Sequence, residues 1–117
     1  MSIKLARQGD VLIERIDKLP IGLRQAKRDE SGRIVLAYGE TSGHAHAIRD
    51  KGVIGLRMAG SEDVDYIEVG GSGATLSHEY LSGAMADHHP VELAPGTYKV
   101  TRQVEYQPKA LPRRVVD

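Results

Sequence analysis

The sequence predicts an all-β protein, a small antiparallel barrel or sandwich built from about eight short strands. Short runs rich in Val, Ile, Leu and Thr recur along the chain, and clusters of Gly, Pro, Asp and Ser separate them. The sequence contains no long amphipathic helix pattern. It also contains no Phe, Trp or Cys, so the core must consist of aliphatic, largely β-branched side chains with some of the five tyrosines.

The length of 117 residues is typical of one domain with a single core. We assign residues 1–107 to one all-β domain and residues 108–117 to a basic, proline-containing C-terminal tail. We find neither a signal-peptide pattern nor an apolar run of about 18 residues, so we expect a soluble cytoplasmic protein with no membrane partner. Lys plus Arg and Asp plus Glu both number 16. The zero net charge indicates no general attraction to nucleic acid.

The N-terminal third is expected to contain one buried strand and one hairpin. Residues 1–8 fit either a helical turn or an extended lead-in. Residues 10–16 are an apolar, β-branched block that predicts a strand buried on both faces. Residues 23–28 and 33–38 flank a turn cluster at residues 29–32, which predicts a hairpin.

The middle of the chain predicts a second hairpin and one further strand. Residues 44–48 carry two histidines, and a turn at residues 50–52 leads to a strand at residues 53–58. The next strand, residues 64–69, has an alternation that fits burial of either face. The glycine cluster at residues 70–73 lacks the Lys-Ser/Thr ending of a phosphate-binding loop, so we interpret it as a mobile turn.

The C-terminal part contains the strongest hairpin pattern. A strand at residues 74–78 precedes residues 79–87, which show no alternation and fit a loop with one helical turn. Residues 91–93 and 98–106 flank a Pro-Gly pair that favours a type II turn. In the second arm, Lys99 and its alternate neighbours should face solvent. The buried face should comprise Tyr98, Val100, Arg102, Val104 and Tyr106.

Two of the five histidines, His44 and His46, form an H-x-H pair after a glycine-containing turn. In a strand, residues i and i+2 point to the same face, so both imidazoles reach the same side. Their Cα atoms would lie roughly 6.5 to 7 Å apart. At that spacing, two imidazoles can bind one metal ion at about 2.0 to 2.1 Å. The alternative interpretation is a pair of polar surface residues on an ordinary strand.

The other three histidines form a second group. Metal sites commonly combine a close pair of ligands on one element with single ligands from distant elements. We therefore predict a metal site made of His44, His46, His78 and His88. Either His88 or His89 fits the fourth place, because neighbours on an extended segment point to opposite faces.

Three acidic residues lie close to these histidines in the sequence. Each is a candidate for a metal ligand, a general base or a hydrogen-bond partner of an imidazole. They are Glu40, Glu79 and Asp87. Of the three, Glu79 is our predicted catalytic residue.

The missing cysteines exclude thiolate ligands, so any metal must be held by histidine, carboxylate or backbone oxygen. Three imidazoles and a water would leave an open position for hydrolytic or oxygen chemistry on a small molecule. Four imidazoles would close a tetrahedral shell and make the ion structural. We expect a divalent metal, zinc first, with Fe, Ni, Mn and Cu also compatible with imidazole ligands.

Several blocks of the sequence resemble a family of small bacterial and phage-borne proteins of unassigned activity. They are Q-G-D-V-L-I at residues 8–13, G-E-T-S-G-H-A-H at 39–46, P-G-T-Y at 95–98 and R-Q-V-E-Y at 102–106. The resemblance spans nearly the whole chain and implies one histidine near residue 78 and another shortly before Pro90. It favours His78 and His88. The chain has a longer linker than the family at residues 80–87, which keeps His89 open as the alternative.

A second resemblance is to cupins, whose first motif runs Gly, a spacer, H-x-H and then Glu. Gly39, His44, His46 and Asp50 are similar to this motif. The second cupin motif is a P-x-G followed by histidine, and here no histidine follows Pro95-Gly96. The resemblance implies a cupin-like, metal-binding β-barrel.

Other function classes are compatible with the sequence. A structural or assembly module would form a homo-oligomer or dock on a partner through residues 98–117, with any metal only a staple. Nucleic-acid binding through Arg102, Lys109, Arg113 and Arg114 is disfavoured by the zero net charge and the few aromatic residues. A serine hydrolase is not supported, because the serines lie in no nucleophile motif.

Overall fold

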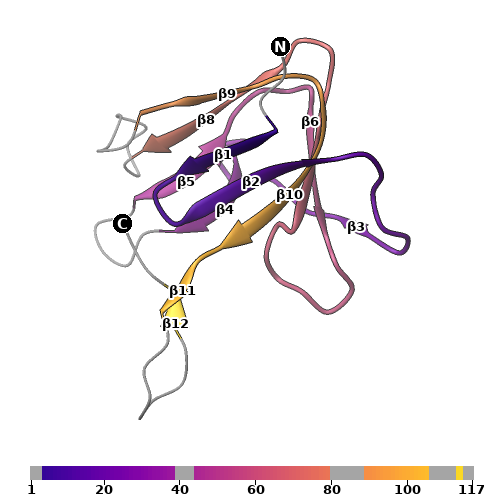
Figure 1. Ribbon diagram of the computed structural model, residues 1–117, viewed down its shortest axis with the longest axis horizontal. Helices are drawn as coiled ribbons and strands as arrows, with labels where there is room; N and C mark the ends of the chain where they lie inside the picture. The colour runs from indigo at the N-terminus through magenta and orange to yellow at the C-terminus, as the bar shows by residue number, and fades with distance from the viewer. Residues whose placement is uncertain (1–3, 39–43, 80–88, 106–112, 115–117) are drawn as a thin grey trace.

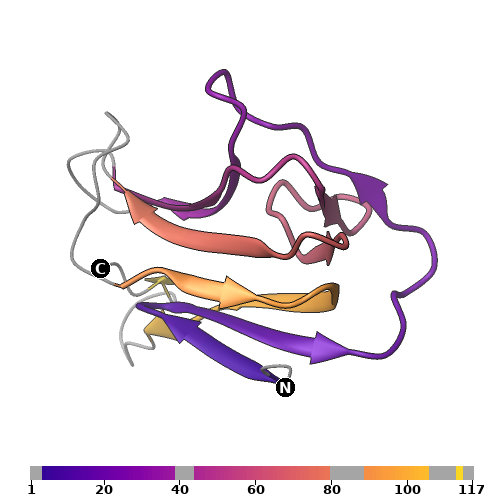
Figure 2. The same cartoon turned by 90° about the horizontal axis from the view of Figure 1, so that it is seen from above.

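The computed structural model describes residues 4–38, 44–79, 89–105 and 113–114, and shows two antiparallel sheets packed face to face (Figures 1 and 2). The larger sheet contains, in spatial order, β1 (Leu5–Gln8), β2 (Val11–Ile16), β10 (Gly96–Arg102), β7 (Tyr66–Val69), β6 (Val53–Arg57) and β3 (Arg24–Gln25). The smaller sheet contains β4 (Ile34–Tyr38), β5 (Ala45–Ile48), β8 (Ala74–Glu79) and β9 (Val91–Leu93).

This architecture confirms the all-β prediction and identifies the fold as a sandwich. Over the described residues, the two sheets share no strand and do not close into a barrel. In Figure 2, the indigo strands β1 and β2 lie in one layer and the salmon strand β8 lies in the other. In the part of the chain that the structure describes, no helix is long and apolar enough to cross a membrane.

The chain enters the larger sheet through a tight hairpin between β1 and β2. Gln8 pairs with Val11, so Gly9 and Asp10 form the turn, and Gly9 has the positive φ of 57° that tight hairpin turns require. Residues 5–8 are therefore a strand, which decides between the two expectations for this segment. The prediction that residues 10–16 are buried on both faces is wrong. Val11 and Ile13 are buried, but Glu14 on the opposite face is exposed, because only one face of the sheet meets the core.

Three predicted hairpins are wrong, although turns are present at residues 30–31 and 51–52 and a bend at Pro95. The segments 23–28 and 33–38 lie in different sheets, as do 44–48 with 53–58 and 91–93 with 98–106. At the first turn, the Asp29 amide donates to the Arg33 carbonyl, yet Arg24 pairs with Arg57 of β6. A turn reverses the chain without dictating which strands pair. Each of these turns carries the chain from one sheet to the other.

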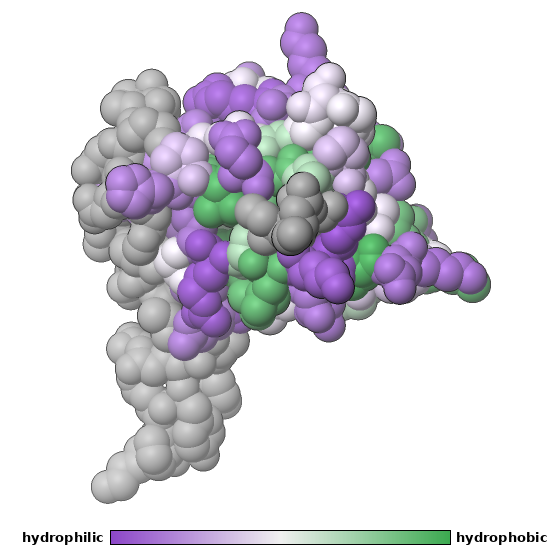
Figure 3. Space-filling model, turned by 45° about the horizontal axis from the view of Figure 1, so that its top comes forward, coloured by the Kyte–Doolittle hydropathy of each residue, from purple (hydrophilic) through white to green (hydrophobic). Residues whose placement is uncertain are grey.

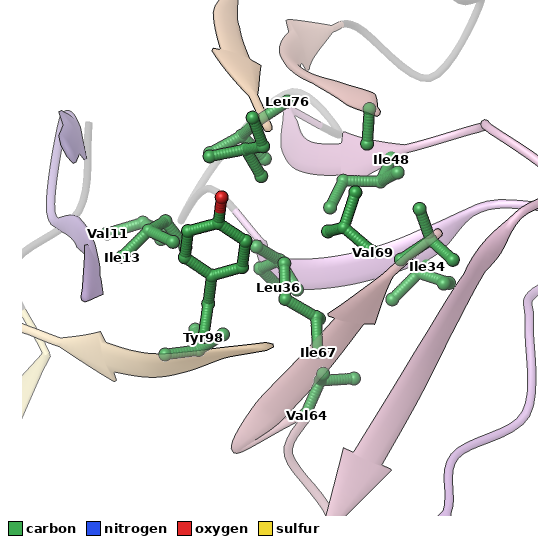
Figure 4. Close-up of a cluster of buried hydrophobic side chains, with 14 of the residues drawn as sticks. Val11, Ile13, Ile34, Leu36, Ile48, Val64, Ile67, Val69, Leu76 and Tyr98 are labelled. Atoms are coloured by element: carbon green, nitrogen blue, oxygen red, sulfur yellow. The ribbon is translucent and has the colours of Figure 1, made fainter. Parts of the chain in front are cut away.

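The hydrophobic core lies between the sheets and is aliphatic, with one tyrosine among its largest members. Figure 4 shows the Tyr98 ring reaching from β10 into a group of aliphatic side chains from both sheets. Its hydroxyl donates to the Ala94 carbonyl, so the buried oxygen is satisfied. The fully buried aliphatic residues around it include Val11, Ile13, Leu36, Ile48, Ile67 and Leu76.

Side-chain alternation along the long strands follows the sheet faces. In β7, Ile67 and Val69 face the core, which resolves the ambiguous register. In β10, Tyr98 and Val100 are buried while Lys99 is exposed, which confirms the predicted faces for the described part of this strand. On the face of the molecule in Figure 3, hydrophilic side chains surround smaller hydrophobic areas.

The C-terminal region forms a separate two-stranded ladder of β11 (Val104–Glu105) and β12 (Arg113–Arg114). The Gln103 amide donates to the Asp10 carbonyl just before this ladder begins. The predicted boundary between residues 107 and 108 lies outside the described residues and stays a prediction.

Candidate functional site

Three of the four predicted metal ligands meet between the sheets. His46 of β5 is the direct cross-strand partner of His78 of β8. Their rings are stacked with centroids 4.4 Å apart and an interplanar angle of 13°. The ring of His44 meets the ring of His78 edge-on, with centroids 5.4 Å apart. We call His44, His46 and His78 the histidine cluster.

The strand geometry explains why these three rings gather. His44 and His46 are two residues apart, so both can approach His78 on the neighbouring strand from the same face. That face is the inner one, because His46 contacts Gln8 of the larger sheet, and His46 and His78 are each only 1% exposed. The predicted fourth ligand, His88, lies outside the described residues. His89 is described, and its main-chain carbonyl accepts a hydrogen bond from Gln8.

The opposite sheet contributes two polar side chains from the β1–β2 hairpin. Gln8 and Asp10 are buried, at 2% and 3% exposure. The Gln8 Oε1 atom lies 2.8 Å from His46 Nδ1. The Asp10 Oδ1 atom lies 3.4 Å from His46 Nε2. The two residues that flank Gly9 therefore face the two nitrogens of one imidazole.

The hydrogen bonds of Gln8 define the tautomer of His46. The Gln8 Nε2 atom donates to the carbonyls of Leu76 and His89, both at 2.9 Å. Both amide hydrogens are therefore used, and Oε1 is left as an acceptor. His46 Nδ1 must then carry a hydrogen and donate it to Gln8. This contact directs Nε2 of the same ring toward Asp10.

Glu79, our predicted catalytic residue, is bound to two arginines and does not face the histidine cluster. It follows His78 in β8, so its side chain points to the opposite face of the sheet. Its oxygens accept from Arg49 Nη2 at 2.9 Å, Arg49 Nε at 3.1 Å and Arg33 Nη1 at 3.3 Å. Arg33 also pairs with Asp29 at 2.8 Å. Instead, the carboxylate of Asp10 lies beside a histidine of the cluster.

The strand beside His46 contains a β-bulge. The pairing of β4 with β5 shifts register between Val35 and Ala37, which brings Ala37 opposite His46. At the bulge, the carbonyl of Leu36 accepts a hydrogen bond from Arg102 Nη1. Bulges are frequent next to functional sites, where they re-aim side chains.

Other predicted residues have roles away from the cluster. Asp50, part of the cupin-like pattern, lies two residues beyond the end of β5. Its carboxylate accepts a hydrogen bond from the Thr75 amide. Arg102, considered for nucleic-acid binding, donates to the carbonyls of Leu36 and Val64 and to Asp65. Glu40 and Asp87 lie outside the described residues, as do Lys109 and Tyr106.

A cavity of about 680 Å³ opens beside β4, lined by Arg33, Val35 and Tyr38 among others.

No group of three or more His, Cys, Asp or Glu side chains within the described ranges is arranged to hold a metal ion as it stands. The stacked arrangement of His46 and His78 explains this result in part. Two parallel rings direct their nitrogens alongside each other rather than toward a common point. A shared ion would require one of the two rings to turn.

A family model described as "Domain of unknown function (DUF8820)" matches residues 7–103, which is most of the chain. The chain belongs to this family. The DUF8820 match contains Gln8, Asp10 and the whole histidine cluster. It confirms the expectation of a small-protein family of unassigned function, and it does not extend to the cupin resemblance. Comparison with curated proteins and with solved structures found no match.

Gln8 and Asp10 were not among the residues that we proposed for the site. They form part of the Q-G-D block, in which two polar residues flank a glycine directly before an apolar strand. Such a pattern is typical of an exposed hairpin turn. Their burial against His46 depends on the second sheet, so no local pattern distinguishes them.

Proposed function

We propose that this member of the DUF8820 family binds one divalent transition-metal ion between its two sheets. The imidazoles of His44, His46 and His78 are the proposed ligands, with His88 completing the set. The observation that carries the proposal is the contact of three histidine rings, with His46 of β5 and His78 of β8 buried between the sheets and the half-buried His44 directly before β5. Imidazole is the commonest metal ligand of proteins.

The hydrogen bond from His46 to Gln8 supports this proposal. A histidine that binds a metal through one nitrogen usually donates the hydrogen of its other nitrogen to a carbonyl or carboxylate. Gln8 Oε1 accepts such a bond from Nδ1 of His46. His46 would then bind an ion through Nε2, which faces Asp10.

Formation of the site requires a rotation of the His78 imidazole. The ring now stacks on His46, and turning it about its own side-chain bonds would direct a nitrogen toward the same point as His46 Nε2. His44 meets His78 edge-on and is two residues from His46, so a small adjustment brings all three together. Zinc is our first choice of metal. An open position would support metal-dependent chemistry on a small molecule.

Metal content measured by plasma mass spectrometry on tag-free protein tests the proposal. Wild-type protein reconstituted with Zn, Fe, Ni, Mn or Cu should retain about one equivalent of one of these metals per chain. The double variant His44→Ala with His46→Ala should lose it. Lys99→Ala is the control, because Lys99 is exposed in β10 and is not a candidate ligand.

The result that overturns the proposal is wild-type protein that retains none of the five metals. The structural or assembly module would then be the better hypothesis. Amide NMR spectra of all three proteins show whether each variant keeps the sandwich, so that metal loss is not a consequence of unfolding.

A further inference from the structure

We propose that the carboxylate of Asp10 is a ligand of the same ion, which makes the site a mixed histidine and carboxylate centre that spans both sheets. This inference rests on the proposed metal-binding function. It differs from the histidine-only ligand set, because it adds a residue from the larger sheet and gives the site a negative charge.

The first step of the argument is the state of His46. Gln8 donates both amide hydrogens to main-chain carbonyls, so its oxygen accepts from His46 Nδ1. A neutral imidazole with hydrogen on Nδ1 has a lone pair on Nε2. That lone pair faces the Asp10 carboxylate, which is itself an acceptor. A cation placed between these two acceptor atoms, either a proton or a metal ion, would contact both of them.

The second step is the distance between these two atoms. Charged N–H···O contacts are typically about 2.7 to 2.9 Å long. The separation of His46 Nε2 and Asp10 Oδ1 is longer, at 3.4 Å. A metal ion about 2.05 Å from each of these two atoms, which lie 3.4 Å apart, would have a ligand–metal–ligand angle of about 110°. This angle is close to the tetrahedral value. The spacing therefore suits a metal ion better than a shared proton.

The third step is how the hairpin positions both residues. Gln8 and Asp10 flank Gly9, whose positive φ of 57° allows the tight turn between β1 and β2. The Asp10 carbonyl accepts from the Gln103 amide, which holds the turn against the end of β10. A short and anchored turn thus directs one side chain to each nitrogen of His46. The carboxylate would also offset part of the charge of a divalent ion in this buried region.

The absence of cysteine from the chain allows a direct test with the variant Asp10→Cys. A thiolate in the ligand shell of Co²⁺ gives an intense near-ultraviolet charge-transfer band, and a thiolate on Zn²⁺ gives a bond of about 2.3 Å in X-ray absorption. If Asp10 is a ligand, Asp10→Cys shows the charge-transfer band when it is loaded with Co²⁺ and the metal–sulfur bond when it is loaded with Zn²⁺. Wild-type protein loaded in the same way shows neither.

A second measurement uses the wild-type chain and does not depend on the folding of a variant. Addition of Zn²⁺ should shift the carboxyl ¹³C resonance of Asp10. The carboxyl resonance of Asp65 is the internal control, since Asp65 is also buried but contacts Arg102 and the Met58 amide. An Asp10 resonance that stays unchanged while one equivalent of Zn²⁺ binds would contradict the inference.

The outcomes separate the inference from the proposed function. Wild-type protein that binds none of Co²⁺, Zn, Fe, Ni, Mn and Cu overturns both. Metal binding without a thiolate signal in Asp10→Cys, and without a shift of the Asp10 resonance, overturns the carboxylate ligand alone. In that case the site is built from imidazoles only.

Discussion

At the scale of single residues, Gln8 and Glu79 make polar contacts on opposite sides of the smaller sheet and have different roles. On the inner face, Gln8 orients His46 through a buried hydrogen bond. On the outer face, Glu79 is held by Arg33 and Arg49. Buried ion pairs are weak evidence for stability, but removing one partner is costly because the remaining charge is left uncompensated. Glu79 and Arg33 thus form a structural link between β8 and the start of β4.

Asp29 extends this ion-pair network toward the surface. Partial burial acts to raise the pKa of its carboxyl, but hydrogen bonds from the Arg33 amide and side chain and the charge of Arg33 outweigh it. The pKa in the folded protein therefore lies below its ordinary value of 3.8. A lowered folded pKa contributes stability that is present above the unfolded pKa and is lost as the pH falls through the folded pKa.

We therefore predict that Asp29→Asn is less stable than wild type at pH 7 and that the difference shrinks below about pH 4. Urea unfolding midpoints at pH 7 and at pH 3 measure this change. Asp17→Asn replaces an exposed aspartate in the loop after β2 and should change stability by less than about 0.5 kcal/mol at either pH. An Asp29→Asn deficit that is equally large at both pH values would contradict the ionic explanation.

At the scale of elements, β6 and β7 are neighbouring strands, and the main chain directly before β6 contacts the main chain directly after β7. Val53 pairs with Val69, and the Gly70 amide donates to the Gly52 carbonyl at 3.0 Å. A Cβ atom on Gly70 would lie only 2.8 Å from that carbonyl oxygen. The backbone of Gly52 cannot move without disturbing the turn that leads from β5 into β6.

Gly70→Ala should therefore destabilise the protein by roughly 1 to 3 kcal/mol, the usual cost of overpacking. Gly71→Ala is the matched control, because a Cβ atom there meets nothing within 4 Å. We expect its free energy of unfolding to stay within about 0.5 kcal/mol of wild type. Denaturant unfolding of both variants checks this, and equal stability of the two would refute the proposed clash.

At the scale of the whole molecule, the two sheets are held together by the aliphatic core between them. Leu76 of β8 is fully buried in this core, and its carbonyl accepts the hydrogen bond from Gln8 across the gap. In Figure 4, Leu76 lies near Tyr98 and Val11 of the opposite sheet. The same packing brings the β1–β2 hairpin against the histidine cluster, so core and site depend on one interface.

Leu76→Ala should cost about 2 to 5 kcal/mol of unfolding free energy, because it leaves a cavity between the sheets. Leu5→Ala removes an equal number of atoms from a side chain that is 59% exposed, so its effect should be within about 0.5 kcal/mol. Thermal and urea unfolding compare the two variants. A small loss for Leu76→Ala would mean that the sheets are held together mainly by something other than this core.

Much of the fold can be predicted from the sequence, and less of the site. The strand-rich pattern, most strand positions and the turns at residues 30–31 and 51–52 were predicted correctly, because turn chemistry and side-chain alternation are local properties. The type II turn expected at Pro95-Gly96 is not present, since Gly96 has a φ of 151° and begins β10. The partners of those strands were not, since three predicted hairpins connect different sheets. Alternation places His44 and His46 on the same strand face, but the approach of His78 depends on the pairing of β5 with β8. The approach of Asp10 required knowledge of how the sheets pack.

The sequence by itself determined an all-β chain with an aliphatic core and a pair of histidines on one strand face. Only the tertiary structure decided that Gln8 and Asp10 face His46 and that Glu79 faces Arg33 and Arg49. The physical reason is that alternation places a side chain on one of two faces but does not say which face is covered. Packing of one apolar sheet face on the other made that choice, and with it selected Asp10 as the carboxylate beside the histidines.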